Sequence, residues 1–307
     1  MKTGAVSVAA TGSRFTDFLA LTKPRLNSLV VVTAGVGYVL GAASLPTNLG
    51  AVRAFDLMIL LHTVIGSALV AGAAAALNQL AERDIDEAME RTRRRPIPSA
   101  RVQPAEARLF ASVLAGVGIV QLTLAANVLA ALLAVTTLVT YVWVYTPLKR
   151  RTHWATLVGA IPGALPPVIG WAAARGSVNT AGWVIFFIVF LWQLPHFHAL
   201  SWMYREDFRR GNLPLLAVID TDGRRTARHA LGFAILLVPV SALPIFVGLG
   251  GQLYLVPTVI LGMIFVTLSA RFAAERTHAR ARALFVGSLV YLPLLWGLLV
   301  FDTITIR

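Results

Sequence analysis

About nine runs of roughly 20 mostly apolar residues limit the possible folds of this chain more than any other feature. Each run is long enough to cross a bilayer as a helix, and no two-residue alternation recurs, which argues against a membrane β-barrel. We therefore expect an all-α integral membrane protein. The predicted spans are 26–46, 57–81, 104–123, 126–146, 154–174, 180–203, 229–249, 252–270 and 283–302.

The composition supports this class. Hydrophobic residues make up 57% and charged residues 13% of the 307 positions, so a soluble fold could not cover its surface with polar groups. The chain has no cysteine, which excludes disulfides, thiolate metal sites and a cysteine nucleophile. The first run is too long and too late for a signal peptide, so we expect a retained span. Two tight hairpins are expected, near 125–127 and 248–251.

The net charge of +13 would by itself suggest nucleic acid, but the distribution of the charges argues for a membrane. With nine spans, only Arg53, Arg175 and Arg307 of the 27 basic residues fall on one side, which leaves 24 on the other. Basic residues favour the cytoplasmic side. We therefore expect a multi-pass inner (plasma) membrane protein with a cytoplasmic N-terminus, a C-terminus on the opposite side and no nucleic-acid partner.

Three oxygen-bearing side chains recur every four residues at the end of the second span. On one continuous helix Asn78, Glu82 and Asp86 lie within an arc of about 80°, stacked over two turns. Such hard oxygen donors suit Mg²⁺, which takes few protein ligands together with phosphate oxygens. A solvated helix end paired to nearby arginines is the alternative, but the aligned triplet and the arginine cluster that follows favour a functional site.

The sixth span ends in a second acidic segment. If its helix continues past Pro195, His196 and Asp207 share a helix face, because they differ by only about 20° in helical phase. His196 is then expected deep in the site and Asp207 at its mouth. His198 faces another way. A structural histidine bonded to a neighbouring helix is the alternative for His196.

Two acidic clusters beside Arg91, Arg95 and Lys149 predict a site for a metal-bridged diphosphate. The chain has no Gly-rich nucleotide loop and no HExxH motif, so nucleotide hydrolysis and zinc hydrolysis are not expected. A diphosphate beside an apolar interior favours an isoprenyl diphosphate.

At these residues the sequence resembles the UbiA superfamily of intramembrane prenyltransferases, over roughly residues 17–302. The superfamily's first acidic motif, Asn-x3-Asp/Glu-x3-Asp, is matched by Asn78, Glu82 and Asp86. Within the superfamily, the resemblance is to the branch that modifies heme. The other matching stretches are Leu21-Thr-Lys23-Pro-Arg25, Met89-Glu-Arg91-Thr92-x-x-Arg95-Pro96, Tyr145-Thr-Pro-Leu-Lys149-Arg-Arg-Thr152, Pro162-Gly-Ala-Leu-Pro166-Pro167-Val-Ile-Gly-Trp171, Trp192-Gln-x-Pro-His196-Phe and Tyr204-Arg-Glu-Asp207.

His196 separates the branches, because quinone-branch members have an aspartate there and imidazole suits an iron porphyrin. Phe208, the Arg210-Gly211 pair and His198 depart from the pattern without removing a proposed ligand.

The resemblance implies a bundle of nine spans around a central cavity that opens to the cytoplasm. The implied reaction transfers farnesyl from farnesyl diphosphate to a vinyl group of heme B, with addition of water and release of diphosphate. The expected partners are these two substrates, membrane lipid and, as a candidate, a downstream heme A synthase. Another superfamily member acting on a quinone precursor or a chlorin, and a proton- or cation-coupled transporter, are the alternatives.

The resemblance also implies residue roles. Mg²⁺ is the expected cofactor, and its expected ligands, catalytic together with His196, are Asn78, Glu82, Asp86 and Asp207. The expected substrate-binding residues are Arg91, Arg95, Lys149, Lys23, Arg25, Glu206 and Tyr204. Lys23 and Arg25 contact the same anion or only anionic lipid. His196 ligates heme, orients it or accepts a proton.

The resemblance implies one membrane domain over 26–302. A cytoplasmic segment precedes it at 1–25, and a non-cytoplasmic tip follows at 303–307. The loops 87–103 and 205–228 are expected to cover the site.

Overall fold

The computed structural model describes residues 13–45 and 56–305, and its regular structure in these two ranges is entirely helical. Nine helical segments of this part are long and apolar enough to cross a membrane, so the prediction of an all-α membrane protein is confirmed. The helices are α1 (Arg14–Leu21), α2 (Pro24–Ala43), α4 (Leu57–Ala81), α5 (Arg83–Ala88), α6 (Pro104–Ala125), α7 (Val128–Val139), η2 (Thr140–Tyr145), α8 (Thr146–Leu148), α9 (Ala155–Arg175), α10 (Thr180–Met203), α11 (Arg205–Arg210), α12 (Leu216–Ile219), α13 (Arg224–Ala242), η3 (Leu243–Val247), α14 (Gln252–Ala274) and α15 (His278–Thr305).

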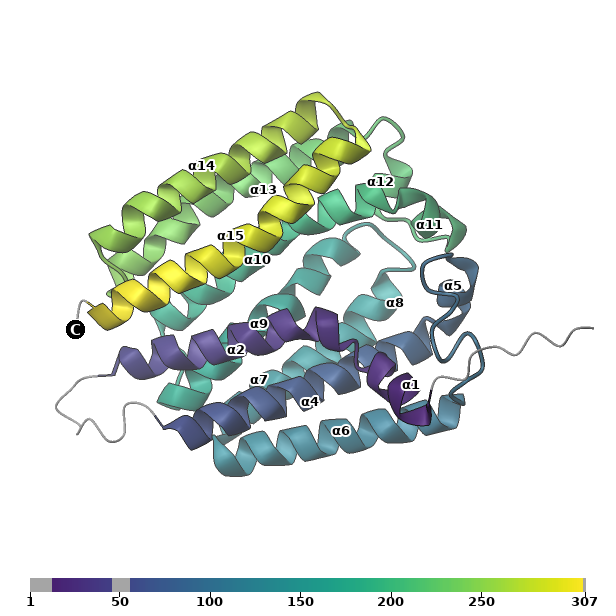
Figure 1. Cartoon of the computed structure of the whole chain (residues 1–307), viewed down its shortest axis with the longest axis horizontal. Helices are drawn as coiled ribbons and strands as arrows, with labels where there is room; N and C mark the ends of the chain where they lie inside the picture. Colours follow the sequence, from purple (N-terminus) through teal and green to yellow (C-terminus); the bar gives the residue numbers. More distant parts are fainter. Residues whose placement is uncertain (1–12, 46–55, 306–307) are drawn as a thin grey trace, which may run out of the picture.

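The long helices form two groups that meet along the middle of the molecule (Figure 1). One group contains α2, α4, α6, α7 and α9, and the other contains α10, α13, α14 and α15. Helix α10 packs against α9 of the first group, and α15 contacts α2. The short helices α5, α11 and α12 gather at one end of the bundle (Figure 1). Helix α5 follows α4 of the first group, and α11 and α12 follow α10 of the second. A site on these short helices therefore combines residues from both groups.

Most helix ends agree with the sequence-based boundaries, and the differences have physical causes. The seventh and ninth spans begin at Arg224 and His278, about a turn earlier than expected, because basic side chains can extend from a helix end into the polar interface. The first span starts at Pro24, a residue favoured in the first helical turn. The last helix continues to Thr305, into the predicted tip. Arg53 and Arg307 lie outside the described residues.

Both predicted hairpins are present. Asn127 separates α6 from α7, and its side chain accepts a hydrogen bond from the Ala130 backbone N–H at 2.9 Å. Between η3 and α14, Gly248 adopts a left-handed conformation with φ 73°. Asparagine as an N-cap and glycine at positive φ are typical at these places.

The predicted N-terminal segment contains a helix that the hydrophobic pattern did not indicate. Ser13 caps α1, and Phe18 packs against Phe110 of α6 with the ring centroids 5.1 Å apart. After α1 the chain turns sharply at Lys23, which has φ 47° and ψ 57°. This turn brings the residues before the first span onto the end of α4.

Close approach of α2 and α9 holds the centre of the first group. A Cβ added to Gly170 would lie 1.8 Å from the Ala34 carbonyl oxygen, and one added to Gly37 would lie 1.9 Å from that of Pro167. Small residues permit such backbone contact between membrane helices. Helix α9 contains three prolines, which are tolerated because most of the helix is buried among its neighbours.

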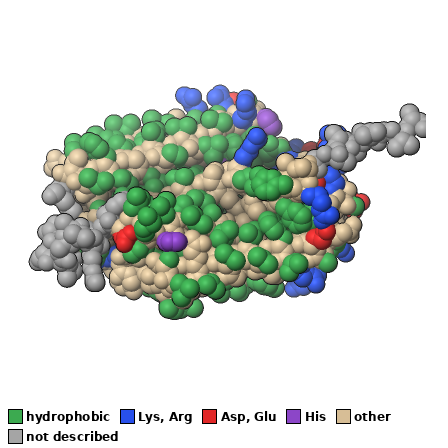
Figure 2. Space-filling model, turned by 60° about the horizontal axis from the view of Figure 1, so that its bottom comes forward, with side chains coloured by type: hydrophobic (Ala, Val, Ile, Leu, Met, Phe, Trp, Pro, Cys, Tyr) green, Lys and Arg blue, Asp and Glu red, His purple; other side chains and the backbone are tan. Residues whose placement is uncertain are grey.

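The surface has the distribution expected of a membrane protein. Large apolar side chains cover the flanks, and Leu124 and Phe246 are each 81% exposed. Figure 2 shows hydrophobic side chains over the long flank, with most of the lysine and arginine of that face toward one half. We refer to the end that carries α5 and α11 as the basic end.

Candidate active site at the basic end

The first acidic motif lies on a broken helix. Helix α4 ends at Ala81, and Glu82 (φ −102°, ψ 15°) separates it from α5. The expectation of one continuous helix is therefore wrong here. The backbone hydrogen bonds from Glu82 N–H to Asn78 O and from Asp86 N–H to Glu82 O are nevertheless made, at 2.9 and 2.8 Å. All three motif residues are buried, with at most 3% of each exposed.

Lys23 and Asn78 are joined directly. The Lys23 ammonium donates to Asn78 Oδ1 at 3.2 Å, and the Asn78 amide donates to Thr146 Oγ1 at the same distance. Burial, helped by the nearby Arg95 charge, lowers the pKa of Lys23 to about 7. Lys23 also has the left-handed backbone conformation directly before Pro24, which is disfavoured for that position. Such strain concentrates at functional sites.

Each carboxylate of the motif is paired with a different cation. The Lys149 ammonium lies 3.2 Å from both oxygens of Glu82, and one Arg95 nitrogen donates to both oxygens of Asp86 at 2.7 and 2.8 Å. The Asp86 side chain is 1% exposed and that of Arg95 is 21% exposed. The alternative considered from the sequence was a solvated helix end whose carboxylates pair with nearby arginines. Both carboxylates do pair with cations, but the pairs are largely buried and do not lie at a solvated helix end.

The second acidic segment also follows a break. Helix α10 passes through Pro195 but ends at Met203, and Tyr204 (φ −109°, ψ 22°) separates it from α11. The helical phase expected to link His196 with Asp207 therefore does not apply. The Asp207 carboxylate instead accepts hydrogen bonds from the backbone N–H groups of Glu90 and Arg91, both at 3.1 Å. Asp207 thus ties α11 to the segment that follows α5.

Arg91 and Tyr204 meet in a shallow pocket of about 340 Å³. The Arg91 guanidinium lies over the Tyr204 ring, 5.4 Å from its centroid, and burial lowers the pKa of Arg91. The pocket is lined by Glu90, Arg91, Met203, Tyr204, Glu206, Asp207 and Arg210. Glu206 is 62% exposed and pairs with Arg209. Glu206 is therefore a rim residue.

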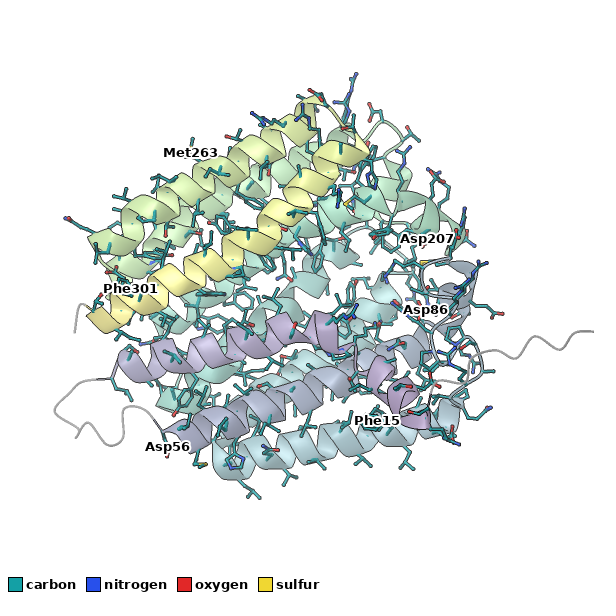
Figure 3. The ribbon with its side chains drawn as sticks, in the orientation of Figure 1. Phe15, Asp56, Asp86, Asp207, Met263 and Phe301 are labelled. Carbon is teal, nitrogen blue, oxygen red and sulfur yellow. The ribbon has the colours of Figure 1, made fainter. Side chains whose placement is uncertain are left out.

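An apolar cluster holds the two acidic segments together. Ile85 and Met89 pack with Phe208 and other residues of the second segment. A Cβ on Gly211 would lie 2.9 Å from Ile85, so the backbone approaches closely there. Figure 3 shows Asp86 and Asp207 at the same end of the bundle. Two segments distant in sequence thus form one candidate site.

The predicted residues fall into two sets, and two of them, Arg25 and His196, belong to neither. Lys23, Asn78, Glu82, Asp86, Arg95 and Lys149 form a buried polar cluster. Arg91, Tyr204, Glu206 and Asp207 line the pocket. Arg25 is exposed and contacts neither set. Within residues 13–45 and 56–305, no three acidic or histidine side chains converge as a metal-binding group. The buried cluster nonetheless offers oxygen ligands of the kind that Mg²⁺ prefers, namely one side-chain amide oxygen and two carboxylates.

His196 lies between α10 and α15, away from the acidic residues. Its Nδ1 is 2.7 Å from Ser288 Oγ, and its ring centroid is 4.7 Å from that of Phe285 and 5.4 Å from that of Trp192. His198 faces His229 instead, as the phase argument expected. The role of His196 remains a prediction.

Sequence reasoning missed a polar contact and a π-helical turn. Thr146 orients the Asn78 amide, and its own hydroxyl donates to the Tyr141 carbonyl at 2.8 Å. That carbonyl belongs to η2, in which the Tyr141 and Tyr145 rings stack with centroids 5.3 Å apart. A π-turn often marks a functional site. The four-residue spacing of the two tyrosines, directly before Thr146, was the available signal.

Comparison with known proteins finds relatives of this chain in sequence and in fold. The chain is 46% identical over 286 residues to the protoheme IX farnesyltransferase of Solibacter usitatus, covering 93% of this chain and 98% of that protein. The fold resembles a digeranylgeranylglyceryl phosphate synthase (TM-score 0.77, 17% identity, 95% and 99% covered). It also resembles an Archaeoglobus fulgidus UbiA homologue bound to GPP and Mg²⁺ (TM-score 0.58, 15% identity, 94% and 99% covered). Residues 29–298 match the model of the UbiA prenyltransferase family, to which this chain therefore belongs.

Proposed function

We propose that the chain transfers the farnesyl group of farnesyl diphosphate to a vinyl group of heme B, adding water and releasing diphosphate to give heme O. The observation that carries this proposal is the 46% identity to a protoheme IX farnesyltransferase across nearly the whole of both chains. The buried polar cluster supports it, because a diphosphate leaving group needs a dense set of cations.

Asn78, Glu82, Asp86 and Asp207 are the proposed Mg²⁺ ligands. The first three present oxygens in the buried cluster, and Asp207 faces the adjoining pocket. Bound Mg²⁺ supplies positive charge that stabilises the departing diphosphate. The solved relative bound to GPP and Mg²⁺ supports a metal of this kind.

The cations of the cluster act on the same anion. Lys23, Lys149 and Arg95 now donate to the proposed metal ligands, and each can turn toward a phosphate oxygen when a substrate enters. Lys23 gains most from this exchange, because an anion beside its buried ammonium offsets the desolvation that lowers its pKa. Arg91 and Tyr204 bind the substrate at the mouth, and Glu206 remains at the rim.

His196 is the proposed heme contact. It lies on α10 between the buried Trp192 and the partly buried Phe285, and the Phe285 ring offers aromatic surface for a porphyrin. Its Nδ1 contacts Ser288, which leaves Nε2 as the nitrogen for iron ligation, heme orientation or proton acceptance.

The basic end is proposed to face the cytoplasm of a bacterial inner membrane. The described helices place the loops that carry most of the basic residues at this end, and the positive-inside tendency then sets the orientation. The segments 87–103 and 205–228 cover the site, and the second contains α11 and α12. A downstream heme A synthase would meet the product in the same membrane.

Two measurements test the proposal. Mass spectrometry of extracted hemes, with and without this protein, detects farnesyl-bearing heme directly, and its absence overturns the proposed reaction. Competition by a quinone precursor or a chlorin tests the acceptor, and Mg²⁺-dependent diphosphate release separates the enzyme from a transporter.

A second experiment tests the residues. Asp86→Asn and Asp207→Asn are assayed in membranes supplied with heme B, farnesyl diphosphate and Mg²⁺, with Glu275→Gln as a control whose side chain is 58% exposed. We expect both site variants to lose heme O formation and the control to keep it. Near-normal product from both site variants refutes the metal-ligand assignment.

A further inference from the structure

A groove opens on the outer surface of the first helix group, near the basic end. Its volume is about 610 Å³, and it lies between the end of α4, the first half of α6 and η2. Six of its lining residues are Leu77, Leu80, Arg83, Arg108, Val142 and Trp143. The lining therefore combines an apolar floor with two cations.

The groove is separate from the candidate active site. Leu80 is about 200° around the helix from Asn78, so α4 presents the groove and the buried cluster on different faces. Trp143 is 59% exposed beside the groove. Exposed tryptophan near the end of a membrane span is typical of the lipid interface.

Both arginines lie close to the level where a span meets the polar interface. Arg108 is four residues inside the start of α6, which is about 6 Å along the helix axis. Arg83 is the first residue of α5, just beyond the end of α4. A long arginine side chain can reach the headgroup region from either place.

Neither arginine has an acidic partner among residues 13–45 and 56–305. The adjacent carboxylate of Asp84 is already bound by Arg150, at 2.7 and 3.0 Å. Two exposed cations that have no acidic partner and lie beside apolar surface can attract an anionic headgroup at the edge of a bilayer. The charge and the shape of the groove together specify an amphiphilic anion.

We propose that this groove binds one anionic phospholipid of the surrounding leaflet. The phosphate lies between Arg83 and Arg108, and one acyl chain follows Leu77, Leu80 and Trp143. The bound lipid joins α6 to the α4–α5 break, because Arg83 directly follows Glu82. Such binding stabilises the folded state, and the stabilisation grows with the logarithm of the lipid concentration once that exceeds the dissociation constant.

The test measures lipid retention on the intact protein. The full chain is purified in detergent, incubated with phosphatidylglycerol or phosphatidylcholine, and examined by native mass spectrometry. Each basic residue near an anionic headgroup contributes roughly a fivefold preference. We expect Arg83→Gln/Arg108→Gln to reduce the preference for phosphatidylglycerol by about 25-fold. The matched control, Arg228→Gln/Arg282→Gln, removes two exposed arginines at the same end and is expected to leave it unchanged.

A second variant tests the shape of the groove without changing its charge. Ser112→Trp places a bulky side chain in the lining, and we expect it to lower phosphatidylglycerol retention while the protein remains folded by circular dichroism. Unchanged retention in the double arginine variant overturns the proposal, as does equal retention of phosphatidylcholine by the unmodified protein. Displacement of the lipid by millimolar inorganic phosphate also refutes it.

Discussion

The buried pair of Asp86 and Arg95 gives the sharpest test of how the candidate site is built. Arg95→Met removes the cation and leaves a carboxylate that is almost fully buried, whereas Asp86→Asn removes the charge and keeps the shape. A double-mutant cycle with both changes isolates the interaction between the two side chains.

The magnitude follows from burial. Removing one partner of a buried ion pair costs about 3–5 kcal/mol, because the other charge is left without compensation. The Arg95 side chain is 21% exposed, so water screens part of that cost and the lower end of the range applies. We expect Arg95→Met to lower the free energy of unfolding by about 3 kcal/mol. We expect the coupling energy of the cycle to be about 2 kcal/mol.

The assay is reversible unfolding in mixed micelles, followed by circular dichroism, for the four proteins of the cycle. The same cycle at Glu275 and Arg280 is the control, since that pair has a similar distance of 3.0 Å but side chains that are 58% and 37% exposed. Exposed pairs contribute about 0–1 kcal/mol. Burial is then the main difference between the two cycles.

A coupling energy for Asp86 and Arg95 no larger than that of the exposed control would refute this reasoning. It would mean that the two side chains do not form a buried pair in the substrate-free protein. Heme O formation is measured on the same variants. Loss of activity in Asp86→Asn with little loss of stability would separate the proposed metal role from the structural one.

Four further changes have expected outcomes. Gly170→Ala should lower the free energy of unfolding by about 3 kcal/mol, because its Cβ would overlap backbone atoms of α2. Gly116→Ala, with no atom within 4 Å of its Cβ, should raise it by about 0.5 kcal/mol, and denaturation in micelles measures both. Lys149→Met should slow heme O formation on the order of 10²-fold, whereas Arg151→Met, an exposed neighbour, should have little effect in the same assay. Ala100→Gly should raise the free energy of unfolding by about 0.5–1 kcal/mol, because φ at this position is 58° and a residue with a Cβ is strained in the left-handed conformation.

The positions of the spans were predictable from the sequence, because a helix that crosses the bilayer needs a run of about 20 mostly apolar residues. Predicted and observed spans agree within a few residues, and the hairpin at Asn127 has the cap that its sequence indicates. The helix α1 was missed because its apolar residues, among them Phe18, occupy only two turns.

The residue types of the candidate site were predictable, but their contacts were not. A spacing of four residues indicated that Asn78, Glu82 and Asp86 face one way, and their burial agrees with that. Nothing in the local pattern marks Glu82 as a helix break, and α5 beyond it packs against the distant second segment, a contact that local sequence cannot indicate. The pairing of Glu82 with Lys149 is a contact between distant parts of the chain, which spacing cannot indicate.

The two breaks explain why the candidate site needs both halves of the bundle. Glu82 and Tyr204 end long helices of different groups with nearly the same backbone angles, and each is followed by a six-residue helix. Those short helices share one apolar cluster, and Asp207 of the second accepts backbone hydrogen bonds from the segment after the first. A displacement of either helix group therefore moves acidic residues relative to the cations that face them. Because electrostatic stabilisation of a leaving group depends on preorganised charges, the hydrogen bonds to Asp207 support the proposed reaction by holding the two acidic segments in place.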